Sequence, residues 1–277
     1  MSPDDYCQQK AAQSGSSFYY SFLFLPPERR RAITALYAFC REVDDTVDEC
    51  TDAAIAQAKL IWWRKEINAM LAGNPSHPVT KALQPHLIPY AIEGKYLLAI
   101  IDGMEMDLNQ TRYLDFPGLQ RYCWHVAGVV GILSASIFGV TRPETLQYAE
   151  KLGLAFQMTN IIRDVGEDAR IGRIYLPVNE LQQFNVTAAD ILNARHSENF
   201  EKLMRFQAQR AQKLYDEAFA LLPSEDRRTQ RPGLIMAAIY RALLDEIERD
   251  GFHVLSQRIS LTPIRKLWLA WKTYVRG

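Results

Sequence analysis

Hydrophobic residues recur along this chain at the three- and four-residue spacing of amphipathic helices, and the alternation typical of strands never persists. Prolines and glycines punctuate the pattern, because Pro26-Pro27 precedes the first long hydrophobic segment and Gly73-Asn74-Pro75 ends the second. We therefore predict helices over residues 27–50, 52–72, 88–110, 115–139, 143–168, 197–222, 231–257 and 263–275. No repeat or long linker divides the chain, so residues 1–277 are expected to form a single all-α domain.

The helix predicted over residues 27–50 carries carboxylates inside its apolar stripe. At about 100° per residue, Asp44 and Asp48 fall one turn apart in the middle of that stripe, whereas Asp45 points away and Arg41 borders it. Carboxylates on the core-facing side repel each other, and burying them costs free energy unless a cation compensates. A solvated charge run at the end of a helix is the alternative for this motif taken alone.

The helix predicted over residues 143–168 repeats this arrangement independently. Gln157, Asn160, Asp164 and Asp168 share one stripe on a helix that is apolar on much of its remaining surface. Such a helix is usually buried, with its polar stripe lining a wet cavity. A purely structural polar network is the alternative, but two such stripes in one all-α chain are hard to explain by chance.

Carboxylates four residues apart on one helical face can bind a hard cation together. Mg²⁺ prefers oxygen ligands of this kind and completes its shell with water and substrate phosphates. Zinc is disfavoured because the stripes lack histidine and cysteine, and a di-iron bundle would need Glu-x-x-His pairs that the sequence lacks. Two facing acidic helices would therefore present a cluster of magnesium ions to a diphosphate.

Composition narrows the classes of partner and compartment. The 32 basic and 32 acidic side chains balance, so no nucleic-acid partner is expected. The four cysteines show no metal or disulfide spacing, and the N-terminus lacks the apolar core of a secretory signal. No uninterrupted apolar run approaches the ~18–20 residues of a membrane span. We expect a cytoplasmic protein, at most peripheral on the inner face of the membrane.

Three segments of the chain resemble the squalene and phytoene synthase family. They are SGSSFYYSFLFLPPERRRAITALYAFCREVDDTVDE near the N-terminus, YCWHVAGVVG over residues 122–131, and QMTNIIRDVGEDARIGRIYLP over the second acidic stripe. The order of these motifs and their spread over nearly the whole chain make the resemblance specific. Within the family, SGSSFYYSFLFLPPERRRA and VLSQRISLTPIRKLWLAW look most similar to bacterial presqualene diphosphate synthases of hopanoid biosynthesis.

The resemblance implies an isoprenoid-synthase helical bundle around a central cavity, in which about three Mg²⁺ ions bind together with the substrate diphosphate. It implies that the metal ligands are Asp44, Asp48, Asn160, Asp164 and Asp168, and that the diphosphate contacts include Arg41, Gln157 and Arg163. Salt bridges to neighbouring acids are the alternative for the two arginines. Tyr122 would approach the reacting carbons as a catalytic residue together with the aspartates, although a tyrosine in a helix more often packs in a core. NADPH is not expected as a cofactor.

Further substrate contacts follow from the same resemblance. Ser14, Ser16 and Ser17 lie in a segment that closes over a diphosphate in the family, although they could equally form a flexible cap. Gly128 and Gly131 are expected to leave room for a prenyl chain, since glycine destabilises a helix interior by roughly 1 kcal/mol relative to alanine. The other expected contacts, several of which core packing would also explain, are Phe18, Phe22, Tyr37, Val126, Arg173, Tyr175, Tyr240 and Arg258. Asp102, Glu105 and Asp107, in the segment IDGMEMD, fit either a supporting role or a solvated helix face.

The implied reaction is the head-to-head condensation of two farnesyl diphosphates to presqualene diphosphate plus diphosphate, on a route to squalene and hopanoids. Phytoene, dehydrosqualene or squalene synthesis within the family are alternatives, as are a terpene cyclase of the same fold and a catalytically inactive helical binding protein. Retention of all four stripe aspartates favours an enzyme. The basic, aromatic segment 264–276 could rest on a membrane surface or pack on the domain, and downstream isoprenoid enzymes are candidate partners.

Overall fold

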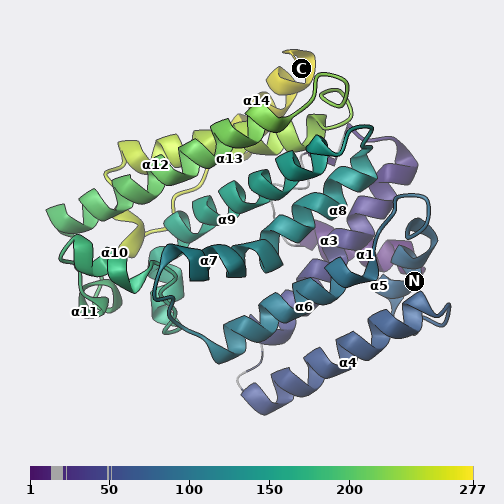
Figure 1. Ribbon diagram of the computed structural model, residues 1–277, viewed down its shortest axis with the longest axis horizontal. Coiled ribbons are helices and arrows are strands. Elements are labelled where there is room, and N and C mark those ends of the chain that lie inside the picture. Colours follow the sequence, from purple (N-terminus) through teal and green to yellow (C-terminus); the bar gives the residue numbers. More distant parts are fainter. Residues whose placement is uncertain (14–20, 23, 49, 51, 277) are drawn as a thin grey trace.

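The computed structural model describes residues 1–13, 21–22, 24–48, 50 and 52–276, and these residues form a bundle of helices (Figure 1). Within this part of the chain, the β pairing is limited to an isolated bridge between Arg112 and Ile174. The all-α prediction is therefore confirmed. In chain order the helices are α1 (Pro3–Gln13), α3 (Pro27–Asp48), α4 (Ala53–Leu71), α5 (Pro78–Leu83), η1 (Gln84–His86), α6 (Gly94–Asn109), α7 (Phe116–Cys123), η2 (Trp124–Gly128), α8 (Val129–Phe138), α9 (Glu144–Arg170), α10 (Val178–Gln183), α11 (Ala188–Leu192), α12 (Glu198–Leu221), α13 (Arg231–Arg249), η3 (His253–Leu255) and α14 (Pro263–Arg276).

Some predicted boundaries were wrong, each for a local reason. The helix predicted over residues 231–257 ends at Arg249, because Gly251 and Phe252 take left-handed φ values of 71° and 59°. Residues 87–91 form turns, so α6 begins only at Gly94. The helix predicted over residues 115–139 contains a π-helical turn, η2, between α7 and α8.

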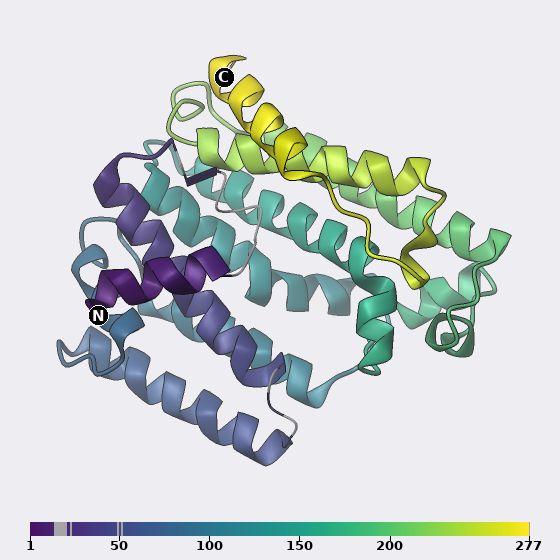
Figure 2. The same ribbon diagram turned by 180° about the vertical axis from the view of Figure 1, so that it is seen from behind.

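The helices pack around two hydrophobic cores. One core holds side chains of α7, α9, α12 and α13, and the other holds side chains of α1, α3, α4, α5 and α6. Helix α8 belongs to both, because Ala135 lies in the first core while Leu133 and Ile137 lie in the second. Helix α8 packs on α9 and on α3, and α1 crosses α3 on the side seen in Figure 2. The bundle thus places α3 and α9, which carry the two acidic motifs, on either side of α8.

A buried carboxylate fixes the start of α9. Asp226, which is fully buried before α13, accepts hydrogen bonds from the backbone N–H groups of Thr141 and Arg142 at 2.9 and 3.1 Å, and from the Thr145 hydroxyl at 2.6 Å. Burial alone would raise the pKa of Asp226, but these hydrogen bonds lower it to about 2. These hydrogen bonds hold the N-terminal end of α9, and the second acidic motif lies near the other end of the same helix.

The continuous segment Phe116–Phe138 is the one helix in the described part of the chain that is long and apolar enough to cross a membrane. Half of its most apolar window is buried inside the bundle, against the helices around it. Burial of this kind is typical of a core helix.

Candidate active site

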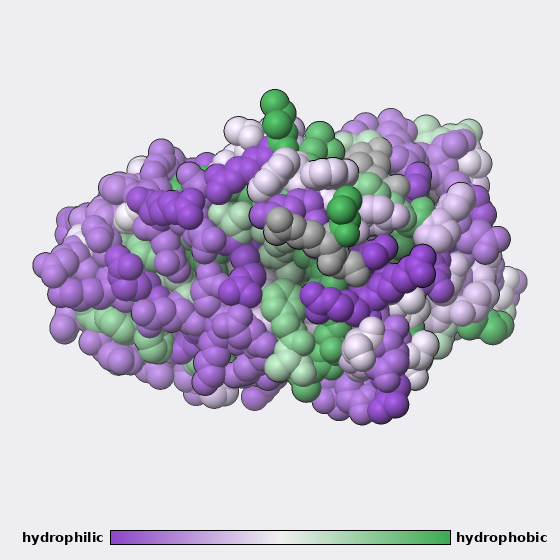
Figure 3. All heavy atoms as spheres, turned by 90° about the horizontal axis from the view of Figure 1, so that it is seen from above, coloured by the Kyte–Doolittle hydropathy of each residue, from purple (hydrophilic) through white to green (hydrophobic). Residues whose placement is uncertain are grey.

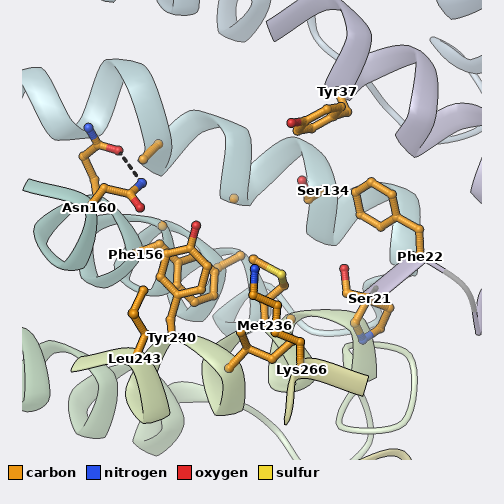
Figure 4. A pocket seen from close by; sticks show the side chains of 18 of the residues that line it. Ser21, Phe22, Tyr37, Ser134, Phe156, Asn160, Met236, Tyr240, Leu243 and Lys266 are labelled. Atoms are coloured by element: carbon orange, nitrogen blue, oxygen red, sulfur yellow. Dashed lines mark hydrogen bonds between the residues drawn. The ribbon is translucent and has the colours of Figure 1, made fainter. Parts of the chain in front are cut away.

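A cavity of about 580 Å³ opens between α3, α8, α9 and α13, and the segment 258–261 that leads into α14 completes its wall (Figure 4). Close to the two acidic motifs its lining is polar, with Arg41, Gln157, Asn160, Arg163 and Arg258. Elsewhere aromatic and aliphatic side chains dominate, among them Phe22, Tyr37, Phe156, Met236, Tyr240 and Leu243. In Figure 4, Tyr37 and Phe22 lie across the cavity from Phe156, Tyr240 and Leu243. The cavity therefore combines a charged region with an apolar interior.

The first acidic motif, at the C-terminal end of α3, belongs to a network of ion pairs. Arg41 donates to Asp44 at 2.6 Å and to Asp45 at 2.5 Å, and Lys10 of α1 lies 2.8 Å from Asp45. Asp45 thus faces α1, away from the cavity. Burial, followed by repulsion from Asp48, raises the pKa of Asp44 to about 7. The Asp44 carboxylate therefore binds a proton more readily than an exposed aspartate does, even with Arg41 beside it.

In the second acidic motif, near the C-terminal end of α9, positive charge is distributed unevenly between the two aspartates. Arg163 pairs with Asp164, and Arg258 Nε lies 3.1 Å from Oδ1 of the same carboxylate. Among the described residues, the Asp168 side chain has no ion-pair or hydrogen-bond partner. Burial, followed by repulsion from Asp164, raises the pKa of Asp168 to about 7. One aspartate of this motif is therefore paired with arginines and the other is left for a ligand.

The structure brings the two acidic motifs together. Repulsion from Asp107 of α6 and from Asp48 of α3 also contributes to the raised pKa of Asp168, so carboxylates from three helices share one electrostatic environment. Arg173 joins them, because its Nη1 lies 3.0 Å from Asp48 Oδ1. The positive charge of Arg173 also opposes the rise in pKa at both Asp107 and Asp168. The result is an acidic cluster held by a few arginines.

A buried carboxylate and two tyrosines form a hydrogen-bonded group beside this cluster. The hydroxyls of Tyr122 and Tyr175 each donate to Asp107 at 2.8 Å, and the two rings stack with centroids 5.2 Å apart. Burial raises the pKa of Asp107 to about 6, and it raises that of Tyr122 well above its ordinary value, so the Tyr122 phenol stays protonated. Asp107 is only 8% exposed, which excludes the solvated helix face that its sequence left open.

The side chains of the acidic cluster fit a hard divalent cation such as Mg²⁺. Their donors are carboxylate and amide oxygens, and Asn160 Oδ1 is buried at the cavity wall without a hydrogen-bond partner. Burial and then repulsion between the carboxylates raise the pKa values of Asp44 and Asp168, and a bound cation would oppose both effects. In the part of the chain that the structure describes, no three acidic, histidine or cysteine side chains already form a chelating group. A cation would therefore need further oxygen ligands, such as those of a phosphate.

The site residues predicted from the sequence fall into three groups. The cavity lining includes Phe22, Tyr37, Arg41, Val126, Gly131, Gln157, Asn160, Arg163, Tyr240 and Arg258. The acidic cluster and the hydrogen-bonded group next to it contain Asp44, Asp48, Asp164, Asp168, Tyr122, Arg173 and Tyr175. The remaining predictions, Ser14, Ser16, Ser17 and Phe18, lie outside the described residues.

Close packing between helices requires glycine at two positions, Gly131 and Gly153. A Cβ at Gly131 would lie 2.2 Å from the carbonyl oxygen of Ala149 in α9, and a Cβ at Gly153 would lie 2.4 Å from that of Ala127. Hydrogen atoms at these positions let α9 approach η2 and α8 closely, although Gly131 still borders the cavity. Gly128 does not line this cavity. The structure thus adds a packing role for Gly131, and the room that Gly128 and Gly131 would leave for a prenyl chain stays a prediction.

Comparison with known proteins agrees with this arrangement over most of the chain. Residues 11–265 match the family model for squalene/phytoene synthase. A phytoene synthase from Arthrospira platensis is 38% identical, over a match that covers 94% of this chain and 89% of the relative. A dehydrosqualene synthase crystallised in complex with a ligand superposes with a TM-score of 0.86 at 27% identity, over 99% of this chain and 96% of that one. For the squalene synthase HpnC from Alicyclobacillus acidocaldarius, the TM-score is 0.80 at 28% identity, over 90% and 94% of the two chains.

Proposed function

Because the chain belongs to the squalene/phytoene synthase family, we propose that it joins two farnesyl diphosphates head to head to form presqualene diphosphate. The proposal rests on one observation, that an acidic region with paired arginines adjoins an apolar cavity. A diphosphate with its cations would bind in the acidic region, and two prenyl chains would bind in the apolar cavity. A binding protein without catalytic activity would have no need to hold Asp168 unpaired at such an electrostatic cost.

The charged region supplies what a departing diphosphate requires. Arg41, Arg163 and Arg258 line the cavity and would donate to diphosphate oxygens in the bidentate manner that suits guanidinium groups. The residues that would hold Mg²⁺ are Asp44, Asp48, Asn160, Asp164 and Asp168. When bound there, Mg²⁺ supplies positive charge that stabilises the leaving diphosphate. The step transfers no hydride, so it needs no NADPH.

The condensation forms a bond between C1 of one farnesyl group and the C2–C3 double bond of the other. The C1–O bond of the first substrate breaks with its electron pair on the diphosphate, and the double bond of the second supplies the electrons of the new bond. Loss of a proton then closes the cyclopropane, so that the products are presqualene diphosphate, diphosphate and a proton. The released diphosphate accepts this proton, assisted by Tyr122, whose hydroxyl is held by Asp107. Apolar walls such as Phe156 and Leu243 exclude water that would otherwise convert the cation to an alcohol.

Geranylgeranyl diphosphate is a second candidate substrate, with phytoene as the eventual product. It is favoured by relatives named phytoene synthase, which are 33–38% identical to this chain. The structural neighbours named for squalene and dehydrosqualene favour the shorter prenyl chain. Both substrates have the same reacting end, so the acidic region suits either, and the depth of the apolar cavity decides between them.

Product analysis tests the proposal directly. The purified protein is incubated with Mg²⁺ and either farnesyl or geranylgeranyl diphosphate, with and without NADPH, and the products are identified by mass spectrometry. Presqualene diphosphate from farnesyl diphosphate, unchanged by NADPH, supports the proposal. Turnover of geranylgeranyl diphosphate alone would transfer the assignment to the second candidate, and squalene formed only with NADPH would add a reductive step. A cyclised product of a single prenyl diphosphate would overturn it.

Matched variants connect the activity to the acidic cluster. Asp44→Ala and Asp164→Ala should each abolish turnover while the helical content measured by circular dichroism stays unchanged. Asp216→Ala is the control, because this aspartate is exposed on α12 and, among the residues that the structure describes, pairs only with Arg241 at 3.0 Å. Wild-type rates in either cluster variant would contradict the assignment of the site.

A further inference from the structure

Helix α14 turns its apolar side outward. Ile264, Leu267, Trp268, Trp271 and Val275 are 47–80% exposed. At about 100° per residue, these positions fall within roughly a third of the helix circumference, so they form one stripe. A surface helix of a globular protein normally shows the opposite arrangement, with its apolar stripe against the core. The exposed stripe therefore requires a covering surface.

The contacts of α14 with the rest of the protein do not use this stripe. The residue that is buried against the bundle is the small Ala270, at 1% exposure. At the end of the helix, Tyr274 stacks on Phe24 with ring centroids 4.5 Å apart, and Arg231 lies over the Tyr274 ring at 5.1 Å. Figure 3 looks onto the side of the molecule that α12, α13 and α14 form, and green side chains project there from a largely purple surface. The helix is thus anchored through Ala270, the partly buried Leu269 and Tyr274, while the five side chains of the stripe stay outside.

The charge of α14 identifies the kind of surface that would cover the stripe. The helix sequence PIRKLWLAWKTYVR contains no acidic residue and four basic ones. Lys272 Nζ lies 4.6 Å above the Trp268 ring, so a positive charge borders the apolar stripe directly. Tryptophan and basic side chains together suit the interface of an anionic bilayer. A second copy of the chain would present the same positive charge and repel the first.

We propose that α14 docks the protein on anionic phospholipid bilayers, with Trp268 and Trp271 inserted among the headgroups. If the proposed function holds, the position of the helix explains what membrane docking would contribute to it. The segment 258–261 and Lys266, at the start of α14, line the reaction cavity. A docked helix would therefore hold the cavity beside the membrane, into which prenyl diphosphates and their products partition.

Co-sedimentation with vesicles tests the docking without reference to activity. The full-length protein is mixed at low ionic strength with phosphatidylglycerol–phosphatidylcholine vesicles or with vesicles of phosphatidylcholine alone. We expect binding to the anionic vesicles that is about a hundredfold weaker in Trp268→Ala/Trp271→Ala and about fivefold weaker in Lys272→Ala. Trp62→Ala is the matched control, because Trp62 is 43% exposed on α4, and it should bind like the wild type.

Several results would overturn the docking. The first is that the wild-type protein stays in the supernatant with both vesicle types. The second is that the double tryptophan variant binds the vesicles as well as the wild type does. A wild-type dimer that dissociates in the tryptophan variant, without any vesicle binding, would show that a second copy covers the stripe. Circular dichroism verifies that each variant is folded. Condensation of detergent-solubilised farnesyl diphosphate, measured in parallel, separates a failure of the docking from a failure of the proposed function.

Discussion

Replacing Asp168 by asparagine should stabilise the metal-free protein at pH 8 while abolishing its activity. The Asp168 carboxylate is partly buried, has no partner among the described side chains, and is repelled by Asp164, Asp107 and Asp48. Asparagine has nearly the same shape without the charge, so the substitution removes this repulsion and leaves the packing intact. A residue whose removal stabilises the protein but stops the reaction is one retained for its chemistry.

The magnitude follows from the pKa of Asp168, which is raised from 3.8 to about 7. The native state binds this proton more tightly than the unfolded chain does. The stabilising effect of the proton is therefore fully present below pH 3.8 and is lost as the pH rises through 7. A pKa shift of this size corresponds to at most about 4 kcal/mol in the free energy of unfolding. Solvent around the partly exposed carboxylate reduces the expected gain in the free energy of unfolding to roughly 2 kcal/mol.

Urea denaturation in EDTA, monitored by circular dichroism between pH 5 and pH 8, measures this difference. The free energies of unfolding of Asp168→Asn and the wild type should differ least at pH 5, and the variant should gain its roughly 2 kcal/mol advantage at pH 8. Added Mg²⁺ and inorganic diphosphate should raise the stability of the wild type more than that of the variant. A variant that is less stable at pH 8, or an advantage that does not change with pH, would refute the view that carboxylates crowd at this point.

Further substitutions at four positions test other parts of the molecule. Gly131→Ala should lower the free energy of unfolding by about 2 kcal/mol, because its Cβ would lie 2.2 Å from a backbone oxygen of α9. Gly172→Ala, at φ +79° in open space, should cost only about 1 kcal/mol, and equal urea midpoints would contradict this comparison. Lys10→Met should cost about 1 kcal/mol by removing the 2.8 Å ion pair to Asp45, with Lys10→Arg recovering most of it in the same assay. Tyr122→Phe should lower kcat by about a hundredfold or more and the free energy of unfolding by about 1–2 kcal/mol, because Asp107 loses a buried hydrogen-bond donor, and an unchanged kcat would exclude a role in catalysis.

The long helices were predictable because each has many residues with one consistent periodicity. Helices α3, α4, α9 and α12 begin and end within a few residues of their predicted ranges. The short helices α5, α10 and α11 were missed, since five or six residues are too few to show a period of 3.6. Helix α1 was missed as well, because its apolar positions are few and only Cys7 and Ala11 are buried. The π-helical turn η2 has no hydrophobic signature distinct from that of the helices around it.

The acidic stripes were visible because helical phase places a charge within an apolar face. Their partners were not, since an ion pair such as Arg173 with Asp48 joins segments that only the tertiary fold brings together. Asp107 could have been recognised. It lies on the same helical face as Ile100, Gly103 and Met104, which are all buried, so its phase marked it as a carboxylate turned inward. Its pairing with Tyr122 still required the structure.

A crystal structure with Mg²⁺ and the unreactive analogue farnesyl thiodiphosphate would test the central claim most directly. The account predicts thiodiphosphate groups and cations between Asp44 and Asp48 on one side and Asp164 and Asp168 on the other, with the farnesyl chains in the cavity lined by Phe156 and Leu243. An analogue bound elsewhere, or cations held by only one of the two acidic motifs, would contradict it.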